Sequence, residues 1–468
     1  MNVLLVGYGP NAIRNHLPFL RNNAINLAAI IELESQRNYL QSEVESFWCK
    51  PSLLFLDDKY KDDYVLPDET RNQFMQESIR LGITHVIINS EPKAHMMYMD
   101  LFVDLPVRIL LEKPILAPNT LKEHTDVQRM MQQYNDMRIR LENGIAKDCQ
   151  IMCQRRCNPA YDFIDETLRS VIEKYDIPVT GVSIDHCDGN WMMPHDLFYE
   201  NHPYMYGYGK LFHSGYHFID LFSRIIQTNS LHGNKAYDKM NIASSFITTH
   251  DEQSIITLED YHRLFNSYEM PSYYSQSDLN PQMYAEFGDK NIVALVSLLN
   301  KQGRTLALAR LGIAQLGFSR RGWINTKDNH YKGNGRIRHE NVDIQVGPLM
   351  SIKVHSYQSS EVGNDFLEPH KTGGQAHFDI DIFRNSEMIG GRVYENFTVK
   401  DFWPKDGGDF HDLNSYSRYR FLEIFFSGKK IMNNAFGEHR LGMELMASLS
   451  HSLIEHRQGN FTTQTIYI

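Results

Sequence analysis

The sequence has few of the features that mark secreted, membrane and nucleic-acid-binding proteins. Five cysteines in 468 residues are too few for a disulfide framework. No apolar run approaches the roughly 20 residues that cross a bilayer, and Met1 leads directly into a strand pattern without a basic and apolar leader. The formal net charge of −10 disfavours nucleic acid and anionic membranes, because both attract basic surfaces. We therefore expect a cytoplasmic protein with neither kind of partner.

Repeats and low-complexity tracts are also lacking, so the chain should form ordinary globular domains. Its hydrophobic content of 42% and charged content of 22% are typical of such domains. Its length allows about two to three of them. Cys149, Cys153 and Cys157 are evenly spaced, but not as the CxxC pairs of zinc and iron–sulfur sites. We expect them to share one face of a strand-like segment and to bind no metal.

The first twelve residues carry the clearest functional pattern. An apolar run, Val3 to Val6, ends at Gly7. Helical spacing of the apolar residues Ile13, Leu17 and Leu20 follows, which predicts a buried strand, a tight turn and an amphipathic helix. The turn has the form G-x-G-x-x-A. Gly7 would make the turn, Gly9 would let a pyrophosphate approach the backbone, and Ala12 would pack the helix against the strand. Free N–H groups and the helix dipole would then hold the phosphates.

An acidic residue follows the glycine loop at the position that a dinucleotide-binding motif requires. Glu32 ends the next apolar run, near the roughly 20-residue spacing of the acid that accepts hydrogen bonds from the ribose. Its carboxylate would repel a 2′-phosphate, which favours NAD, whereas Arg37 could moderate that preference and leaves NADP as the alternative cofactor. A solvated carboxylate in a surface loop is the other interpretation of Glu32.

The first third of the chain alternates strand and helix patterns. Apolar runs at 27–31, 53–56, 84–89 and 107–111 are separated by helical stretches at 37–47 and 68–81. Such alternation predicts right-handed crossovers and a doubly wound parallel sheet. We expect this Rossmann domain to occupy residues 1–145, ending with a helix that runs to about Asn143.

The rest of the chain, residues 146–468, has the pattern of an α+β domain. A helix is predicted at 159–174, a strand at 178–185, and closing helices at 415–427 and 439–457. Alternating runs, the clearest at 377–383, predict a large open and mainly antiparallel sheet with one wet face. Residues 267–282 have the composition of a long loop or insertion.

Four short motifs in this order resemble the glucose–fructose oxidoreductase / inositol dehydrogenase (Gfo/Idh/MocA) family. They are the glycine loop, Ser90-Glu-Pro92-Lys-Ala-His95, Glu112-Lys113-Pro114, and the segment from His213 to Asp220. Gln154-Arg-Arg, Asn158-Pro159 and, less specifically, Leu441-Gly-Met-Glu-Leu-Met are also similar to the family. The cofactor-binding residues expected from motif and resemblance are Gly7, Gly9, Pro10, Asn11, Ala12, Glu32, Arg37, Ser90, Glu91, Pro92, His95 and Glu112.

The resemblance also implies catalytic residues. Lys113 would contact the reacting oxygen, where an ammonium group stabilises a developing alkoxide, and His217 would exchange the proton as a base of near-neutral pKa. The family usually has an aspartate where this chain has His213, so His213 is a third candidate. Asp185 or Asp188 could supply the missing carboxylate. The plain alternatives are a surface lysine and a core histidine.

Two further clusters allow more than one interpretation. A metal site would draw on His186, Cys187, Asp188, His195, His202, His213 and His217, of which only the last two have a familiar ligand spacing. The aromatic residues Trp191, Tyr199, Tyr204, Tyr206 and Tyr208 suit stacking on a sugar ring. They suit a loop core or a subunit interface better.

The leading hypothesis from the sequence is an NAD(P)-dependent oxidoreductase. The resemblance implies interconversion of a secondary alcohol and a ketone on a sugar, sugar derivative or cyclitol, by a homodimer or homotetramer. One alternative is a hydrolase or lyase that uses NAD without net redox change. The other is a sensor that binds a dinucleotide without catalysis.

Overall fold

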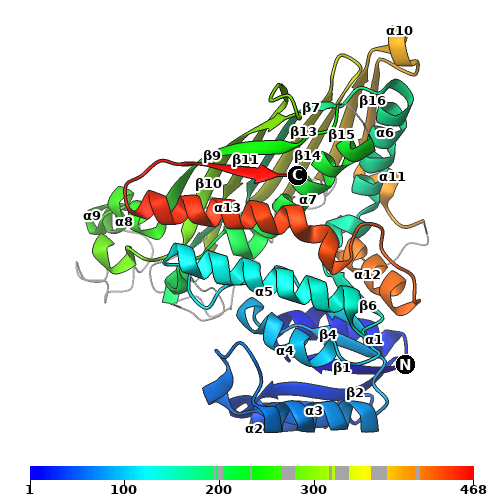
Figure 1. The fold of residues 1–468 in the computed structure, drawn as a ribbon, viewed down its shortest axis with the longest axis vertical. Helices are drawn as coiled ribbons and strands as arrows, with labels where there is room; N and C mark the ends of the chain where they lie inside the picture. The colour runs from blue at the N-terminus through cyan, green and yellow to red at the C-terminus, as the bar shows by residue number, and fades with distance from the viewer. Residues whose placement is uncertain are drawn as a thin grey trace. The chain divides into compact units, whose positions relative to one another are not determined.

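The computed structural model describes residues 1–192, 197–198, 204–231, 235–264, 280–315, 319–321, 337–359, 377–405, 410 and 412–468. His195, His202, Tyr199 and most of the expected loop at 267–282 lie outside these residues. The chain forms two compact units, each made of several segments (Figure 1). The first unit comprises Met1–Asn119, Thr125–Asn158 and Tyr416–Arg440, and the second unit comprises Thr120–His124, Pro159–Ser415 and Leu441–Ile468.

The first unit is built on a six-stranded sheet in the order β3-β2-β1-β4-β5-β6. All neighbouring strands are parallel, and this is the dinucleotide-binding order of doubly wound folds. The strands are β1 (Asn2–Val6), β2 (Asn26–Leu33), β3 (Ser52–Leu56), β4 (His85–Ile88), β5 (Arg108–Leu111) and β6 (Asp148–Ile151). The predicted Rossmann fold is confirmed.

Helices account for the uninterrupted apolar strands, because they cover both faces of the sheet. Val3, Leu4 and Leu5 of β1 are all 0% exposed. The helices of this unit are α1 (Leu17–Asn22), α2 (Arg37–Val44), α3 (Asp68–Arg80), α4 (His95–Phe102), α5 (His124–Asn143) and, from the C-terminal part of the chain, α12 (Leu413–Phe426). Phe426 of α12 stacks on Phe19 of α1, with ring centroids 5.7 Å apart.

The boundary between the units differs from the expected division at residue 145. Residues 148–151 form β6 and pair with β5, which places them in the first sheet. Residues 416–440 also return to this unit, where the Asn434 side chain donates to the Ile151 carbonyl (2.9 Å). One boundary residue cannot divide the chain into these two units, because long-range contacts decide which unit a segment joins. Such contacts leave no local pattern in the sequence.

The second unit contains a nine-stranded sheet in the order β16-β15-β14-β13-β7-β11-β10-β9-β17. Only the β7–β11 pair is parallel among its neighbours, so the expected open, mainly antiparallel sheet is confirmed. Its strands are β7 (Val179–Cys187), β9 (Lys239–Thr248), β10 (Asp289–Leu299), β11 (Thr305–Ala314), β13 (Ile337–Val346), β14 (Met350–Ser359), β15 (His377–Arg384), β16 (Tyr394–Thr398) and β17 (Thr463–Tyr467). β8 (Asn190–Met192) and β12 (Ser319–Arg321) form a separate parallel pair.

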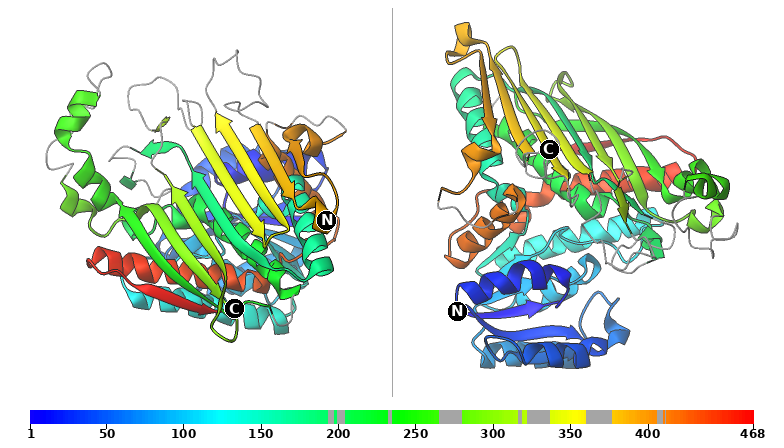
Figure 2. Two further views of the ribbon diagram at one scale, coloured as in Figure 1. Left: turned by 90° about the horizontal axis from the view of Figure 1, so that it is seen from above. Right: turned by 180° about the vertical axis from the view of Figure 1, so that it is seen from behind.

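Among the described residues, helices cover one face of this sheet and leave the other open (Figure 2). On the covered side, His186 of β7 stacks on Phe218 of α7 (Tyr216–Gln227). Gly442 of α13 (Arg440–Arg457) in turn lies against Ser223 of α7. The remaining helices are α6 (Pro159–Tyr175), α8 (Thr249–Ile255), α9 (Leu258–Leu264), α10 (Ser386–Ile389) and α11 (Val399–Phe402).

Two findings bear on the classes excluded from the sequence. Among the described residues, no helix has the length and apolar character to cross a membrane. All five cysteines lie in the described part of the chain, and none of them is joined in a disulfide. The strand expected to carry three of them ends at Ile151, so Cys157 lies instead in a 3-10 turn, Gln154–Cys157.

Candidate functional site

The glycine loop follows β1. Its first glycine is tightly packed against the backbone, and its second glycine has free space beside it. Gly7 has φ of +87°, and its N–H donates to the Ile31 carbonyl (3.0 Å). A Cβ atom there would lie 2.8 Å from the Asn89 oxygen, so only glycine fits. A Cβ atom on Gly9 would meet nothing within 4 Å. The loop is thus tight beneath Gly7 and leaves open space over Gly9.

The helix after the loop differs from the regular one expected. Residues Ala12–His16 form a π-helical turn, and α1 follows it. Ala12 is fully buried as predicted, whereas Ile13, expected on the apolar face, is 37% exposed. The i→i−5 spacing of a π-turn rotates the side chains relative to an α-helix, so the expected apolar stripe starts only at Leu17.

Glu32 lies at the carboxyl end of β2 and reaches the glycine loop. One carboxylate oxygen accepts from the Tyr8 backbone N–H (2.6 Å) and the other from the Leu33 N–H (2.8 Å). The two bonds hold the carboxylate beside the turn, where the dinucleotide motif requires it. Of the two interpretations of Glu32, the solvated surface carboxylate does not fit this geometry.

Arg37 is engaged elsewhere. Its guanidinium donates to both carboxylate oxygens of Glu34 (2.5 and 2.7 Å) and lies 4.0 Å from the centre of the Phe55 ring. The hydrogen bond from Arg37 lowers the pKa of Glu34. In this arrangement Arg37 is neutralised by a neighbour, which limits its use for a 2′-phosphate.

A partly buried polar network joins the ends of β1, β4 and β5. The Asn11 amide donates to Asn89 (2.6 Å) and to Glu112 (2.9 Å), and His16 Nε2 lies 2.9 Å from the same Glu112 oxygen. Burial would raise the pKa of Glu112, but its contacts with His16 and Asn11 and the charge of Lys113 lower it instead. Glu112 is therefore a carboxylate that fixes the loop ends.

This network continues into α12, which the sequence did not connect with the cofactor loop. Asn15 donates to Asn11 (2.6 Å), and Arg418 of α12 donates to Asn15 (2.8 Å) and to Gln154 (2.7 Å). In the sequence, the local sign of this network was the spacing of Asn11 and Asn15, which puts polar side chains one turn apart on the expected helix. Arg418 reaches Asn15 only because residues 416–440 fold back onto the first unit, and no local pattern predicts that contact.

His95, expected to bind the cofactor, lies buried between two loops. It is 0% exposed, and its ring nitrogens lie 3.0 Å from the Ile115 carbonyl and 3.1 Å from the Ser90 carbonyl. Burial is the largest cause of its lowered pKa. His95 therefore bridges the loops after β4 and β5. Glu91, by contrast, is exposed beside it.

Lys113 stands in the loop after β5, half-buried, with a cis peptide bond to Pro114. The charge of Lys113 acts on the Glu112 carboxylate beside it, which is mostly buried. Buried carboxylates normally require such compensating charge. This placement differs from that of an ordinary surface lysine.

In the second unit, residues 210–217, here called the histidine turn, carry both candidate histidines. A π-helical turn, Leu211–Gly215, leads into α7. Buried Asp289 accepts from the backbone N–H groups of Gly209 (3.0 Å) and Leu211 (2.8 Å) and so anchors the start of the turn. His213 and His217 are partly exposed while the residues around them are mostly buried.

The ring of His213 stacks on Tyr204, with centroids 5.9 Å apart. Tyr204 is 1% exposed, and its hydroxyl donates to Gln315 (2.7 Å). It belongs to a small apolar cluster with Leu197, Tyr284 and Phe287. For Tyr204 the loop-core interpretation therefore holds, and the ring supports His213.

The two aspartates proposed as substitutes for the carboxylate at 213 have different positions. Asp185 points to the open face of the sheet and forms an ion pair with Arg310. Asp188, just beyond β7, is mostly buried and accepts from Ser214 Oγ of the histidine turn (3.1 Å). It also pairs with Lys210 of that turn. Asp188 thus contacts the histidine turn through Lys210 and Ser214, two residues that the sequence analysis did not name, whereas Asp185 lies on the other face of the sheet.

The described members of the suggested metal clusters do not converge. Neither the three evenly spaced cysteines nor the histidines and Asp188 around the histidine turn form a set of three neighbouring ligand atoms within the described part of the chain. Burial lowers the pKa of His186 well below its ordinary value, and its ring lies face to face with Phe218 at 4.0 Å.

Neither the known family models nor the curated protein sequences match this chain. Solved structures do. A levoglucosan dehydrogenase in complex with NADH and levoglucosan is 13% identical, with a TM-score of 0.55 over 100% of this chain and 99% of that one. An oxidoreductase from Agrobacterium radiobacter with NAD⁺, L-tartaric acid and magnesium is 12% identical (TM-score 0.54, 100% and 98% covered).

An aldose–aldose oxidoreductase from Caulobacter crescentus, complexed with glycerol, is also 12% identical, with a TM-score of 0.52 over 100% of this chain and 99% of that one. Near-complete coverage of both chains shows that the two units and their connections are shared. At such low identity the likeness concerns the fold. The chain therefore has the fold of these oxidoreductases, as its resemblance to the glucose–fructose oxidoreductase / inositol dehydrogenase family implied.

Proposed function

We propose that this protein is an NAD(H)-dependent oxidoreductase that interconverts a secondary alcohol and a ketone on a sugar, sugar derivative or cyclitol. The observation that carries the proposal is the pairing of the glycine loop with Glu32. The loop is open over Gly9, and the carboxylate is held at its edge by the Tyr8 and Leu33 N–H groups. Solved structures of the same fold hold NAD⁺ or NADH and polyhydroxylated ligands, which supports both parts.

The residues present fit a dinucleotide. Free space over Gly9 lets a pyrophosphate approach the backbone, and Glu32 accepts from ribose hydroxyls. When bound, NAD would accept or return the hydride. Glu32 and the Glu34–Arg37 ion pair both disfavour a 2′-phosphate, so NAD is preferred over NADP.

Acid–base work falls to two side chains. The Lys113 ammonium stabilises negative charge on the reacting oxygen. The imidazole of His217 takes the hydroxyl proton during oxidation and returns it during reduction. His213 stands beside it on the same turn and, stacked on Tyr204, orients the substrate.

Calorimetry with NAD, NADH, NADP and NADPH on the purified full chain tests the cofactor. A panel of sugars, sugar acids and cyclitols, followed at the NADH absorbance band, then tests the reaction. Binding of NADH with turnover of at least one panel member supports the proposal. Failure to bind any dinucleotide, after a check that none co-purifies, refutes it.

His213, which replaces the family's aspartate, favours one alternative, namely redox-neutral chemistry in which the cofactor is reduced and reoxidised within one turnover. The two reactions differ in stoichiometry. One NADH released per substrate consumed excludes the alternative, whereas product formation without NADH release favours it.

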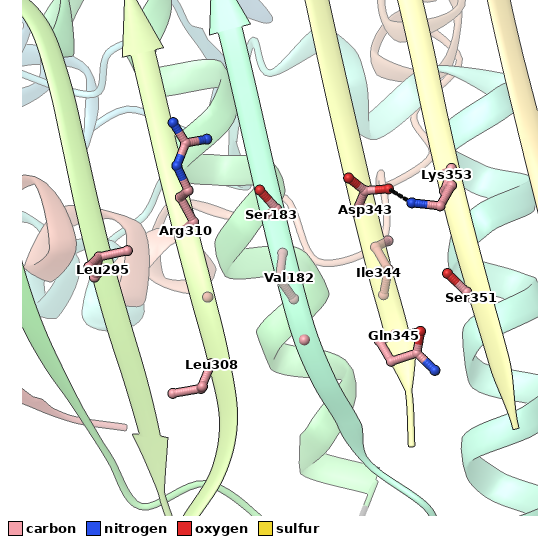
Figure 3. Close-up of a pocket in the computed structure, with 12 residues that line it drawn as sticks. Val182, Ser183, Leu295, Leu308, Arg310, Asp343, Ile344, Gln345, Ser351 and Lys353 are labelled. Atoms are coloured by element: carbon pink, nitrogen blue, oxygen red, sulfur yellow. Dashed lines mark hydrogen bonds and ion pairs between the residues drawn. The ribbon is translucent and has the colours of Figure 1, made fainter. Parts of the chain in front are cut away.

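We further propose that the protein is a homodimer or homotetramer that associates through the open face of the nine-stranded sheet. Leu295 and Leu308 are about 60% exposed there, at 59% and 64%, and border a hollow of about 390 Å³ together with Arg310, Asp343 and Lys353 (Figure 3). Exposed apolar groups rimmed by charges are typical of interfaces. Leu308→Glu should shift the mass measured by light scattering toward the monomer, and an unchanged mass would contradict this interface.

A further inference from the structure

A buried ion pair lies beside the candidate histidines in the second unit. Lys210 is 1% exposed, and its ammonium contacts both the Asp188 carboxylate and the Ser214 hydroxyl. Ser214 donates to the same Asp188 oxygen (3.1 Å), and Arg338 of β13 approaches the other (3.2 Å). A buried ammonium is stable only with such a counter-charge. Asp188 is thus a fixed negative charge at this point.

The ion pair is coupled to the histidines by the geometry of the turn. Lys210 and Ser214 are four residues apart, and both contact Asp188. Ser214 directly follows His213 and precedes His217 by three residues, so the contact with Asp188 lies next to the first histidine in sequence and close to the second. Asp188 is therefore held against the side of the turn that leads to His217.

We propose that Asp188 is the positioning carboxylate of this site, held by Lys210 and Ser214, and that this ion pair sets the protonation of His213 and His217. The inference rests on the proposed function for its catalytic meaning, but its electrostatic part concerns only this chain. It assigns to a residue after β7 the charge that the family places at position 213. Lys210 balances that charge, so that the two act with opposite sign on the histidines.

Other charged groups surround the turn, and the test must separate the pair from them. Within the described residues they are His186 and Glu340 on the sheet, Arg338 beside Asp188, Asp289, Lys290 and Glu252 behind Tyr204, Asp220 further along α7, and Arg457 near Asp289. Burial keeps His186 neutral, and Lys290 pairs with Glu252 (3.0 Å). Because these groups are unaltered in the variants below, they cancel in the comparison.

The test is to titrate the histidine ring signals of the full chain by NMR after selective ¹³C labelling of histidine. His213→Gln and His217→Gln assign the two signals. Asp188→Asn removes a negative charge and should lower the pKa of both histidines by about 0.5 to 1 unit. Lys210→Met removes a positive charge and should raise them by a similar amount. The double variant should return close to wild type.

A matched control is offered by the ion pair between Asp185 of β7 and Arg310 of β11. The pair lies on the opposite face of the sheet, and Asp185→Asn makes the same change in charge three residues before Asp188 in sequence. It should leave both titrations within about 0.2 unit, since the partly exposed pair is screened by solvent. Shifts as large as those of Asp188→Asn would overturn the proposal.

The decisive result is that the histidine pKa shifts have opposite signs in Asp188→Asn and Lys210→Met. A structural disturbance alone would not reverse the direction of the shift when the other partner of the ion pair is removed. Shifts of one sign in both single variants, or no downward shift in Asp188→Asn, would refute the inference. If Lys210→Met does not fold, Lys210→Gln takes its place, and Lys210→Arg should restore the wild-type titration. The pH profile of kcat/KM should move with the same sign. Alternating shifts without turnover of any substrate would leave this inference standing and refute the proposed function.

Discussion

Glu32→Gln is the substitution that most directly tests the cofactor site. The carboxylate has two oxygens, each accepting from a backbone N–H, at 2.6 Å from Tyr8 and 2.8 Å from Leu33. Glutamine keeps the size but has only one accepting oxygen, and it is neutral. Hydrogen bonds to a charged acceptor contribute about 1.5–3 kcal/mol, against about 0.5–1.5 kcal/mol for neutral ones.

The expected magnitudes follow for the two cofactors separately. With NADH, the ribose hydroxyls lose about 1–2 kcal/mol of interaction, which weakens binding by about 5- to 30-fold. With NADPH, a negative charge about 5 Å from the 2′-phosphate disappears. At an effective dielectric of about 20–80 that repulsion is worth about 1–3 kcal/mol per unit charge. The NADH to NADPH preference should therefore fall by at least about 30-fold.

Calorimetric titration of both cofactors at one fixed ionic strength measures these changes. Glu45→Gln is the matched control, since Glu45 is an exposed residue at the end of α2 and the change in net charge is identical. It should leave both dissociation constants within about twofold. An unaltered affinity of Glu32→Gln for NADH, or equal losses in the two variants, would refute the assignment of the ribose-binding carboxylate.

Three further substitutions test the fold around the site. Gly7→Ala should lower the free energy of unfolding in urea by about 2 kcal/mol or more, because Gly7 has a positive φ and a Cβ atom there would lie 2.8 Å from the Asn89 oxygen. Gly9→Ala should fold normally and bind NADH at least about 10-fold more weakly. Equal stability of the two variants would contradict this geometry. Glu252→Gln leaves the buried Lys290 without its counter-charge (3.0 Å) and should lower the free energy of unfolding by about 3–5 kcal/mol. The double variant Glu252→Leu/Lys290→Met should recover most of that loss. A double variant as unstable as Glu252→Gln would show that the ion pair itself stabilises the fold. Burial lowers the pKa of His85 from 6.5 to about 4, so its contribution is present above pH 6.5 and falls by about 3 kcal/mol as the pH decreases toward 4; His85→Leu should flatten urea-unfolding free energies across that window, and an unchanged slope would contradict the assignment.

Local sequence determined the parts of this protein that depend on neighbours along the chain. The run Val3–Val6, the glycines after it and the acid at the end of β2 appear in order because each belongs to one strand or one turn. Helical and strand periodicities likewise predicted α6, β7, β15 and α13 close to their observed bounds. Motif order was enough for the fold, since four short motifs rarely coincide by chance.

Tertiary structure decided which of these residues meet. Alternation along β7 separates Asp185 from Asp188, but only the docking of α7 shows which face is covered and that Lys210 and Ser214 bind Asp188. Pairing of Arg37 with Glu34 and burial of His95 also depended on partners that no local pattern names. The return of residues 416–440 to the first unit is of the same kind. Periodicity is a property of the backbone and is written locally, whereas ion pairs and burial arise between distant segments and exist only once the chain has folded.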